Sequence, residues 1–342
     1  MRTHDAHAGP FPDKPTPSAR SPRRCSAPLR TLEFLKDIWR PLLVEAPVDE
    51  IARRGSLEGL PLRWLPAGRD LTFSGDPFGI WRDGCLFVFV EDFDYRTAHG
   101  TIGVHVLDER LRWIEKRTVL HEPWHLSYPI VFEWDDEIWL LPEASGSESL
   151  ALYRAREFPW HWEKVATITL DVVPLDATPV RRDGLWWLFY GAAGSARERL
   201  TLLNVAWAED LLGPWTPHPL NPVLRDMRGA RPGGRAFEHQ GNLALPIQDC
   251  TRSYGSALRL LHVSTLDRDQ FQARAGGEFL APSGAAPFLD GCHTLSAAGP
   301  VTLVDVKRRH ASFKGLTMRP RRDLAKLAAR WTNRAQTGPD RS

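Results

Sequence analysis

Three segments of the chain repeat one pattern at a spacing of about 50 residues, and this self-similarity limits the folds that the chain can adopt. Residues 76–91 align without a gap with residues 128–143, an offset of 52. A third copy, residues 176–190, follows at an offset of 48. A repeat of this length indicates similar structural units, each of which buries one face against the next.

Each copy reads as a strand, a tight turn and a second strand. The turns are Asp83-Gly84, Asp135-Asp136 and Asp183-Gly184. Asp-Gly between two runs rich in Trp, Phe, Leu, Ile and Val indicates a hairpin, because Gly and Asp tolerate the positive φ that the turn requires. The second strand of each copy is apolar throughout, which is typical of a strand covered on both faces.

Shorter strands follow each hairpin, and four strands in about fifty residues are typical of a propeller blade. Two weaker copies, near Arg231 and Gly291, bring the count to five units between Trp64 and Arg309. A β-sandwich would also show short strands and regular turns. The gapless alignment keeps both the hairpin turn and the Glu that ends each copy, and this favours a propeller over a sandwich. We therefore expect an all-β fold, a five-bladed β-propeller.

The expected propeller covers residues 31–310. Its blades are expected at 65–122, 123–171, 172–226, 227–281 and 282–310, with a strand at 39–44 closing the last one. Residues 1–30 are rich in Pro, Arg and Ser, which predicts a disordered tail without a signal sequence or a transmembrane segment. Residues 311–342 are expected to form a basic tail, with a short helix at 323–331 as one option.

Composition narrows the function classes. The formal net charge is +2, whereas a dedicated nucleic-acid-binding protein usually has a basic face, so no nucleic-acid partner is expected. The four cysteines have no metal-type spacing, and Cys85 lies inside an apolar strand, where a free buried thiol is expected. These features predict a cytoplasmic protein. No cluster of residues in the sequence is distinctive enough to assign a metal, and no cofactor is expected.

Candidate site residues follow from the repeat, because the first strand of every blade lines the central funnel. The residues at the openings of the repeats are Asp76, Tyr128 with His125 just before it, Asp176, Arg231 and His293. The second strands end at Glu91, Glu143 and Gln248 with Asp249, which would form an outer ring. Each residue has an ordinary alternative, such as an Asp that caps a turn, a surface Arg or a buried core His. Their shared structural position favours a functional role.

These residue types suit carbohydrate chemistry. Two carboxyl groups close together in a partly dry pocket acquire different pKa values, which supplies an acid and a base for a glycosidic bond. We expect Asp76 and Asp176 to be the catalytic pair, with Glu143 as a possible substitute acid. The residues expected to bind a hydroxyl-rich or anionic substrate are Glu91, His125, Tyr128, Arg231, Asp249 and His293.

Several motifs resemble a known family. They are Ser74–Gly79, Glu91–Asp94, His125–Pro129, Leu141–Glu143, Asp176–Thr178, Gly229–Pro232, Gln248–Cys250 and His293-Thr294. In this order they resemble the N-terminal domain of plant glucosamine inositolphosphorylceramide transferase and its bacterial relatives. The resemblance, over about residues 39–309, implies a five-bladed propeller of the arabinanase, levansucrase and invertase type. It also implies that transferase chemistry belongs to a separate downstream domain, so the propeller is expected to act alone or for a partner.

The resemblance to glycosidase propellers implies carboxylates in the first three blades. Asp76 matches the first, but Tyr128 stands where a second Asp is usual, and Asp176 stands where a Glu is usual. This departure weighs against ordinary hydrolysis. Three functions remain: an enzyme acting on a glycoside or sugar-phosphate conjugate in glycoconjugate biosynthesis or processing, a non-catalytic sugar-binding propeller that serves a glycosyltransferase, and a protein-interaction scaffold. Polar funnel residues favour the first two.

Overall fold

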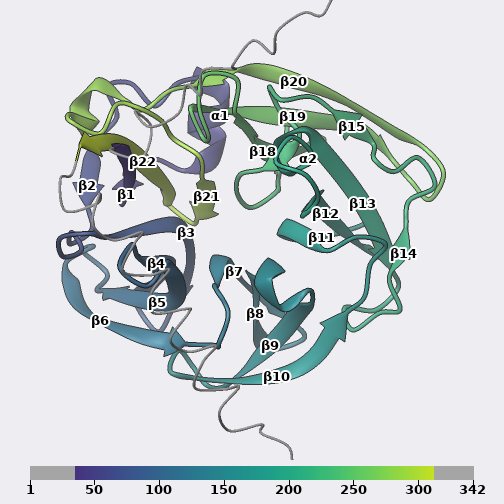
Figure 1. Cartoon of the computed structure of the whole chain (residues 1–342), viewed down its shortest axis with the longest axis horizontal. Coiled ribbons are helices and arrows are strands. Elements are labelled where there is room, and N and C mark those ends of the chain that lie inside the picture. The colour runs from purple at the N-terminus through teal and green to yellow at the C-terminus, as the bar shows by residue number, and fades with distance from the viewer. Residues whose placement is uncertain (1–34, 312–342) are drawn as a thin grey trace, which may run out of the picture.

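The computed structural model describes residues 35–311. The predicted N-terminal tail, the basic tail from residue 312 and the optional helix at 323–331 lie outside the described residues. The described chain forms five β-sheets arranged around a central axis, as Figure 1 shows. The predicted all-β, five-bladed propeller is confirmed.

The sheets follow one another along the chain. The first contains β3 (Thr72–Arg82), β4 (Cys85–Asp94), β5 (His99–Leu107) and β6 (Trp113–Leu120). The second contains β7 (Ser127–Trp134), β8 (Glu137–Glu143), β9 (Leu150–Glu157) and β10 (His161–Ile168). The third contains β11 (Pro174–Arg182), β12 (Leu185–Ala192), β13 (Leu202–Ala208), β14 (Thr216–Pro217) and β15 (Leu224–Arg225). The fourth contains β16 (Arg231–Pro232), β17 (Phe237–His239), β18 (Asn242–Asp249), β19 (Ala257–Leu266) and β20 (Phe271–Phe279).

The fifth sheet joins the two ends of the described chain. It contains β21 (Leu295–Ala298), β22 (Val301–Ala311), β1 (Leu35–Val44) and β2 (Leu62–Trp64), in that order from the axis outward. Strand β1 pairs antiparallel with β22 from Leu35 opposite Ala311 to Val44 opposite Thr302. Backbone hydrogen bonds between the first and last strands therefore close the ring.

Helices are few and short within residues 35–311. They are α1 (Val48–Arg54), α2 (Glu198–Thr201) and the 3-10 turns η2 (Ser145–Ser147) and η3 (Ser283–Ala285). No helix within residues 35–311 combines the length and apolar character needed to span a bilayer.

The hairpin turns have the predicted backbone. Asp83 and Gly84 have φ of 49° and 76°, and Asp183 and Gly184 have φ of 50° and 77°. Positive φ at both central residues is the type I′ geometry, whose twist matches that of the flanking strands. In the second blade two Asp residues at 135 and 136 adopt the same conformation, with φ of 54° and 57°.

The core lies between neighbouring sheets, which explains the continuous apolar runs. In β4, Leu86, Val88 and Val90 pack into the cluster shared with the fifth blade. Phe89, on the opposite face of the same strand, packs into the cluster shared with the second blade. All four side chains are fully buried, and each such burial contributes about 1.5–3 kcal/mol of transfer free energy.

Candidate functional site

A β-bulge at the same repeat position in the first three blades directs side chains toward the axis. Register shifts occur between Gly75 and Phe78, between Ser127 and Ile130, and between Leu175 and Thr178. Within them, Asp76, Tyr128 and Asp176 have φ of 48°, 46° and 48°. Left-handed backbone at a non-Gly residue costs about 1–3 kcal/mol and is common at functional sites. Bulges often re-aim a side chain beside such sites.

A cavity of about 360 Å³ opens where these bulges meet. It is lined by Asp37, Trp39, Phe73, Asp76, Glu91, Phe93, Tyr95, His125, Ser127, Glu143, Ser145, Asp176, Arg199, Arg231, Tyr254 and His293. Seven of the nine residues predicted to be catalytic or substrate-binding are therefore brought together. The two that do not line the cavity are Tyr128 and Asp249.

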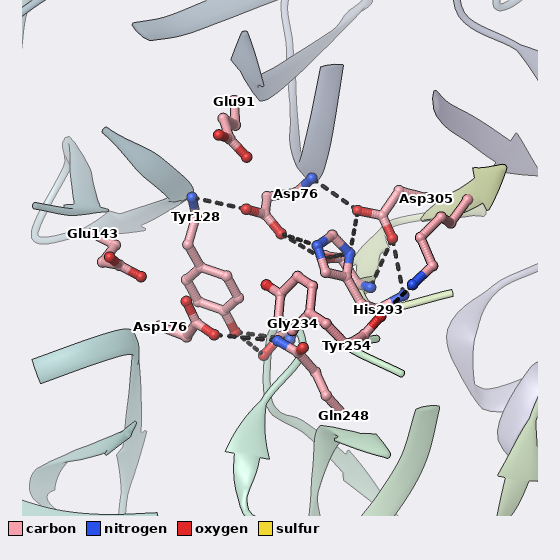
Figure 2. Close-up of polar contacts among 12 residues, drawn as sticks. Asp76, Glu91, Tyr128, Glu143, Asp176, Gly234, Gln248, Tyr254, His293 and Asp305 are labelled. Carbon is pink, nitrogen blue, oxygen red and sulfur yellow. Dashed lines mark hydrogen bonds and ion pairs between the residues drawn. The ribbon is translucent and has the colours of Figure 1, made fainter. Parts of the chain in front are cut away.

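Tyr128 is a buried link between blades. Its hydroxyl lies 2.9 Å from Thr178 Oγ1 and accepts the backbone N–H of Gly234 at 2.7 Å. The hydroxyl also donates to the Gly234 carbonyl at 3.1 Å. These bonds join the second, third and fourth blades across the axis, and Figure 2 shows the contact between Tyr128 and Gly234. Tyr128 occupies the expected position but holds neighbouring blades together there.

Asp249 points away from the axis, contrary to the expectation. Its carboxylate accepts from Arg259 Nε at 3.0 Å and from the Thr251 hydroxyl at 2.6 Å. The preceding residue, Gln248, points inward and donates from Nε2 to Asp176 Oδ2 at 3.2 Å. Alternate residues of a strand face opposite sides, so only one member of this pair can face the site.

Asp76, His293 and Asp305 form one hydrogen-bonded cluster (Figure 2). Asp76 Oδ1 accepts the Thr294 hydroxyl at 2.8 Å and lies 3.6 Å from His293 Nε2. His293 Nδ1 lies 2.7 Å from Asp305 Oδ2, and that oxygen also accepts the backbone N–H of Asp76 at 2.9 Å. Asp76 Oδ2 accepts the backbone N–H of Tyr128 at 3.2 Å. Every member of the cluster is buried.

Burial and charge compete at this cluster. Burial raises the pKa of Asp76 to about 6, with the Asp305 and Asp176 carboxylates adding to the rise and His293 opposing it. Burial alone would lower the pKa of His293, but Asp305 and Asp76 outweigh it and raise that pKa above its usual value. The cluster thus favours a charged imidazolium beside a largely ionised Asp76 near neutral pH.

A second charged cluster faces the first across the cavity. Arg231 donates to both oxygens of Asp176, from Nε to Oδ2 at 2.5 Å and from Nη2 to Oδ1 at 3.2 Å. Arg231 Nη2 also lies 3.8 Å from Glu143 Oε2, and its guanidinium lies 5.1 Å from the centre of the Tyr254 ring. Glu143 Oε1 accepts the Ser145 hydroxyl at 2.8 Å.

The carboxyl groups of Glu143 and Asp176 lie in different surroundings. Burial raises the pKa of Glu143 to about 8, and the neighbouring Asp176 adds to the rise while Arg231 opposes it. The bidentate contact with Arg231 fixes the position of the Asp176 side chain, because charge-assisted hydrogen bonds of this geometry are strong. Glu143 is therefore the protonated partner near pH 7.

Glu91 and His125 complete the lining. Glu91 Oε1 lies 3.5 Å from His125 Nε2. Burial, together with nearby Asp76 and Glu143, raises the pKa of Glu91 well above its usual value. Burial, followed by His99, lowers the pKa of His125 to about 4. Both shifts favour neutral forms, so this contact is better described as a pair of neutral groups than as an ion pair.

Several residues of the site were missed by sequence reasoning. The sequence does contain a signal for Asp305, because it is the one carboxylate within the apolar run Val301–Val306. Trp39 stacks on the His293 ring with centroids 3.6 Å apart and planes 9° apart, and Tyr254 meets that ring edge-on at 5.4 Å. Neither aromatic belongs to the repeat pattern that identified the other residues.

Asp76, His293 and Asp305 also have the composition of a cation site. One donor atom from each lies within 4.8 Å of the others. Both oxygens of Asp305 already accept backbone N–H groups, from Asp76 on one side and from His293 and Thr294 on the other. A cation there would compete with these bonds, so the residues fit a proton-sharing cluster better than a metal centre.

The raised pKa of Glu143 predicts a pH-dependent stability. The folded protein keeps a proton up to about pH 8 that the unfolded chain loses near pH 4.5. The stabilisation from this proton is complete below about pH 4.5 and is lost as the pH rises toward 8. Between about pH 5 and 8, the free energy of unfolding should therefore fall more in the parent than in Glu143→Gln. The difference should be on the order of a few kcal/mol.

Denaturant unfolding at both pH values measures the effect. The control is Glu109→Gln, since Glu109 is exposed on the β5–β6 turn. Identical pH dependence in the Glu143→Gln variant and the parent would contradict the assignment.

Comparisons with known proteins agree with this architecture. The family described as "Glucosamine inositolphosphorylceramide transferase 1, N-terminal" matches residues 65–276. The chain is 37% identical over 211 residues to glucosamine inositolphosphorylceramide transferase 1 of Oryza sativa subsp. indica, covering 60% of this chain and 28% of that protein. It is 33% identical over 210 residues to the Arabidopsis thaliana protein of that name, covering 60% of this chain and 27% of that protein. The chain thus spans little more than a quarter of the length of these curated relatives.

Solved structures share the fold at low sequence identity. A family 117 glycoside hydrolase of the marine bacterium Zobellia galactanivorans superposes with a TM-score of 0.51 at 16% identity, covering 80% of this chain and 91% of that one. The catalytic domain of the Coprinopsis cinerea GH62 alpha-L-arabinofuranosidase gives a TM-score of 0.51 at 12% identity, covering 71% of this chain and 93% of that domain. At these identities the likeness concerns the fold alone.

Proposed function

The chain belongs to the family of the N-terminal domain of glucosamine inositolphosphorylceramide transferase 1, and from this premise we propose that its funnel binds the sugar of a glycoconjugate and acts on a glycosidic bond. The proposed role lies in glycoconjugate biosynthesis or processing. The proposed ligand is a glycoside or a sugar-phosphate conjugate.

The observation that carries the proposal is a pair of carboxyl groups on one cavity with separated pKa values. Asp76 has a pKa of about 6 and Glu143 a pKa of about 8. At pH 7 the first is mostly ionised and the second mostly protonated. A pair separated in this way supplies a base or nucleophile and an acid, the two groups that glycosidic chemistry requires.

The remaining charged residues support these roles. His293 stabilises ionised Asp76, and Asp305 orients the imidazole. Asp176 helps to keep Glu143 protonated, and Arg231 and Gln248 hold the Asp176 side chain in place. In this assignment Glu143, rather than Asp176, is the acid that accompanies Asp76. Asp176 acts as a positioning residue.

Arg199 favours an anionic ligand. It is exposed on α2, lines the cavity, and its side chain forms no ion pair with another residue of the described chain. A guanidinium at the opening suits a phosphate, which it can bind in bidentate fashion. This supports a sugar-phosphate conjugate over a neutral glycan.

The test is the pH dependence of kcat/KM on a panel of glycosides and sugar-phosphate conjugates. Turnover should rise as Asp76 ionises near pH 6 and fall as Glu143 loses its proton near pH 8. Glu143→Gln should remove the alkaline limb and lower the maximum. A value of kcat/KM that stays level from about pH 5 to 9 would refute the assignment of Asp76 as base or nucleophile and Glu143 as acid.

A non-catalytic sugar-binding propeller that serves a glycosyltransferase is the second candidate. Tyr128 takes the place of a carboxylate and makes structural bonds, which leaves fewer reactive groups in the funnel. This candidate predicts saturable sugar binding without product, weakened by Arg231→Ala. A protein-interaction scaffold would show neither binding nor turnover.

We also propose a reducing location such as the cytoplasm. Within residues 35–311, Cys85, Cys250 and Cys292 are free thiols. Unpaired cysteines are typical of compartments that keep thiols reduced.

A further inference from the structure

A second cavity, of about 460 Å³, lies between the fifth and first blades. Its walls come from β1, the connection at residues 66–71, the start of β3 and the end of β22. Figure 1 shows these strands beside one another at the closure of the ring. We call this cavity the basic cleft, defined by Lys36, Arg40, Arg69 and Arg308.

The basic cleft carries an excess of positive charge. Four Lys or Arg side chains and His310 line it, against one acidic residue, Asp70, which has an interaction of its own. Within residues 35–311, none of the four cations lies in an ion pair with a carboxylate. Like charges gathered in one concave surface create a positive potential that attracts an anion.

Two guanidinium groups of the basic cleft are held in fixed orientations. Arg40 donates from Nε and Nη2 to the Leu65 carbonyl, at 3.3 and 3.1 Å, and lies 4.5 Å from the centre of the Trp64 ring. Arg308 lies 5.2 Å from the centre of the Phe288 ring. Its Nε is buried and has no hydrogen-bond partner among the described residues. Such a donor calls for an acceptor, because an unpaired buried polar group is costly.

Apolar side chains share the lining. Ile38, Pro41 and Phe288 face the same cavity as the cations. A bare inorganic anion would leave these contacts unused, whereas an ester adds an organic group that can pack on them. We propose that the basic cleft is a binding site for a phosphate ester, whose phosphate is held by Lys36, Arg69 and Arg308. Its organic group packs against Ile38 and Phe288.

The proposal goes beyond the function of the funnel. Trp39 and Phe73 line both cavities, so the two sites share a wall while using different polar groups. Phosphate-ester binding in the basic cleft therefore does not require Asp76 or Glu143. The two proposals can fail separately.

The experiment is isothermal calorimetry of the full chain with phenyl phosphate and with inorganic phosphate. Phosphatidylcholine vesicles with and without phosphatidylinositol form a second arm. The test variant is Lys36→Gln/Arg69→Gln, which leaves the ring-stacked arginines in place. The matched control is Arg53→Gln/Arg110→Gln, which removes two exposed cations outside the cleft.

Phenyl phosphate should bind the parent more tightly than inorganic phosphate does. The test variant should bind it about tenfold to a hundredfold more weakly, because charge-assisted hydrogen bonds are lost. The control should match the parent. Preference for phosphatidylinositol vesicles without binding of the soluble ester would also support the proposal, and would assign the phosphate to a lipid headgroup.

Three results would overturn it. One is an equal dissociation constant for the test variant and its control. Another is inorganic phosphate binding as tightly as the ester. The third is a parent protein that binds neither the ester nor the vesicles.

Discussion

Replacing Asp76 with Asn should lower kcat/KM by about 10²–10⁴-fold, the usual contribution of a positioned general base. The amide cannot take up a proton or attack the sugar, yet it keeps the size of the side chain and can still pair with Thr294 and the Tyr128 N–H. The melting temperature should change little, because lost attraction to His293 is offset by relief of the burial of a charge. Steady-state kinetics and calorimetric melting measure both quantities.

Asp135→Asn is the matched control, since Asp135 is exposed on a hairpin turn and carries the same substitution. It should leave turnover unchanged. Turnover that survives Asp76→Asn, alone and together with Asp176→Asn, would eliminate the enzymatic proposal and leave sugar binding as the function.

Arg231→Ala should lower the free energy of unfolding by about 3–5 kcal/mol, because it leaves a buried carboxylate without its partner. Asp176, with 4% of its side chain exposed, would lose both guanidinium bonds. Glu143 would lose the nearby positive charge as well. Denaturant unfolding at constant pH gives the difference directly.

Arg252→Ala is the matched control, because Arg252 pairs with Glu278 at an exposed position with 54% of its side chain accessible. An exposed pair contributes about 0–1 kcal/mol. Arg231→Met combined with Asp176→Leu should recover most of the lost stability, since no isolated charge remains buried. An Arg231→Ala variant as stable as the Arg252→Ala control would contradict the buried pair.

The blades and their turns could be predicted because their causes are local. Asp83-Gly84 and Asp183-Gly184 require only the positive φ that their own backbone adopts. The apolar run of β4 reflects cover on both faces, and that pattern is visible in the chain itself. The repeat then placed Asp76, Asp176 and Arg231 at equivalent points without any knowledge of distance.

The rest of the site depends on register and closure, which no short segment contains. Whether Gln248 or Asp249 faces inward is decided by a single step of strand pairing. Trp39 reaches His293 only because β1 joins the fifth sheet, far from its neighbours in sequence. The bidentate contact from Arg231 to Asp176 depends on how closely two blades approach across the axis.

The pairing of β1 with β22 bears on how this protein can be divided for laboratory work. A fragment starting at residue 65, where the family match begins, would lack β1 and β2. It would expose the edge of β22 and remove Trp39, along with the Asp37 carboxylate that lies 3.3 Å from the buried Lys307 ammonium. The limits of the family match are therefore unsafe cloning limits for this protein, and expression designs need the residues from Leu35 onward.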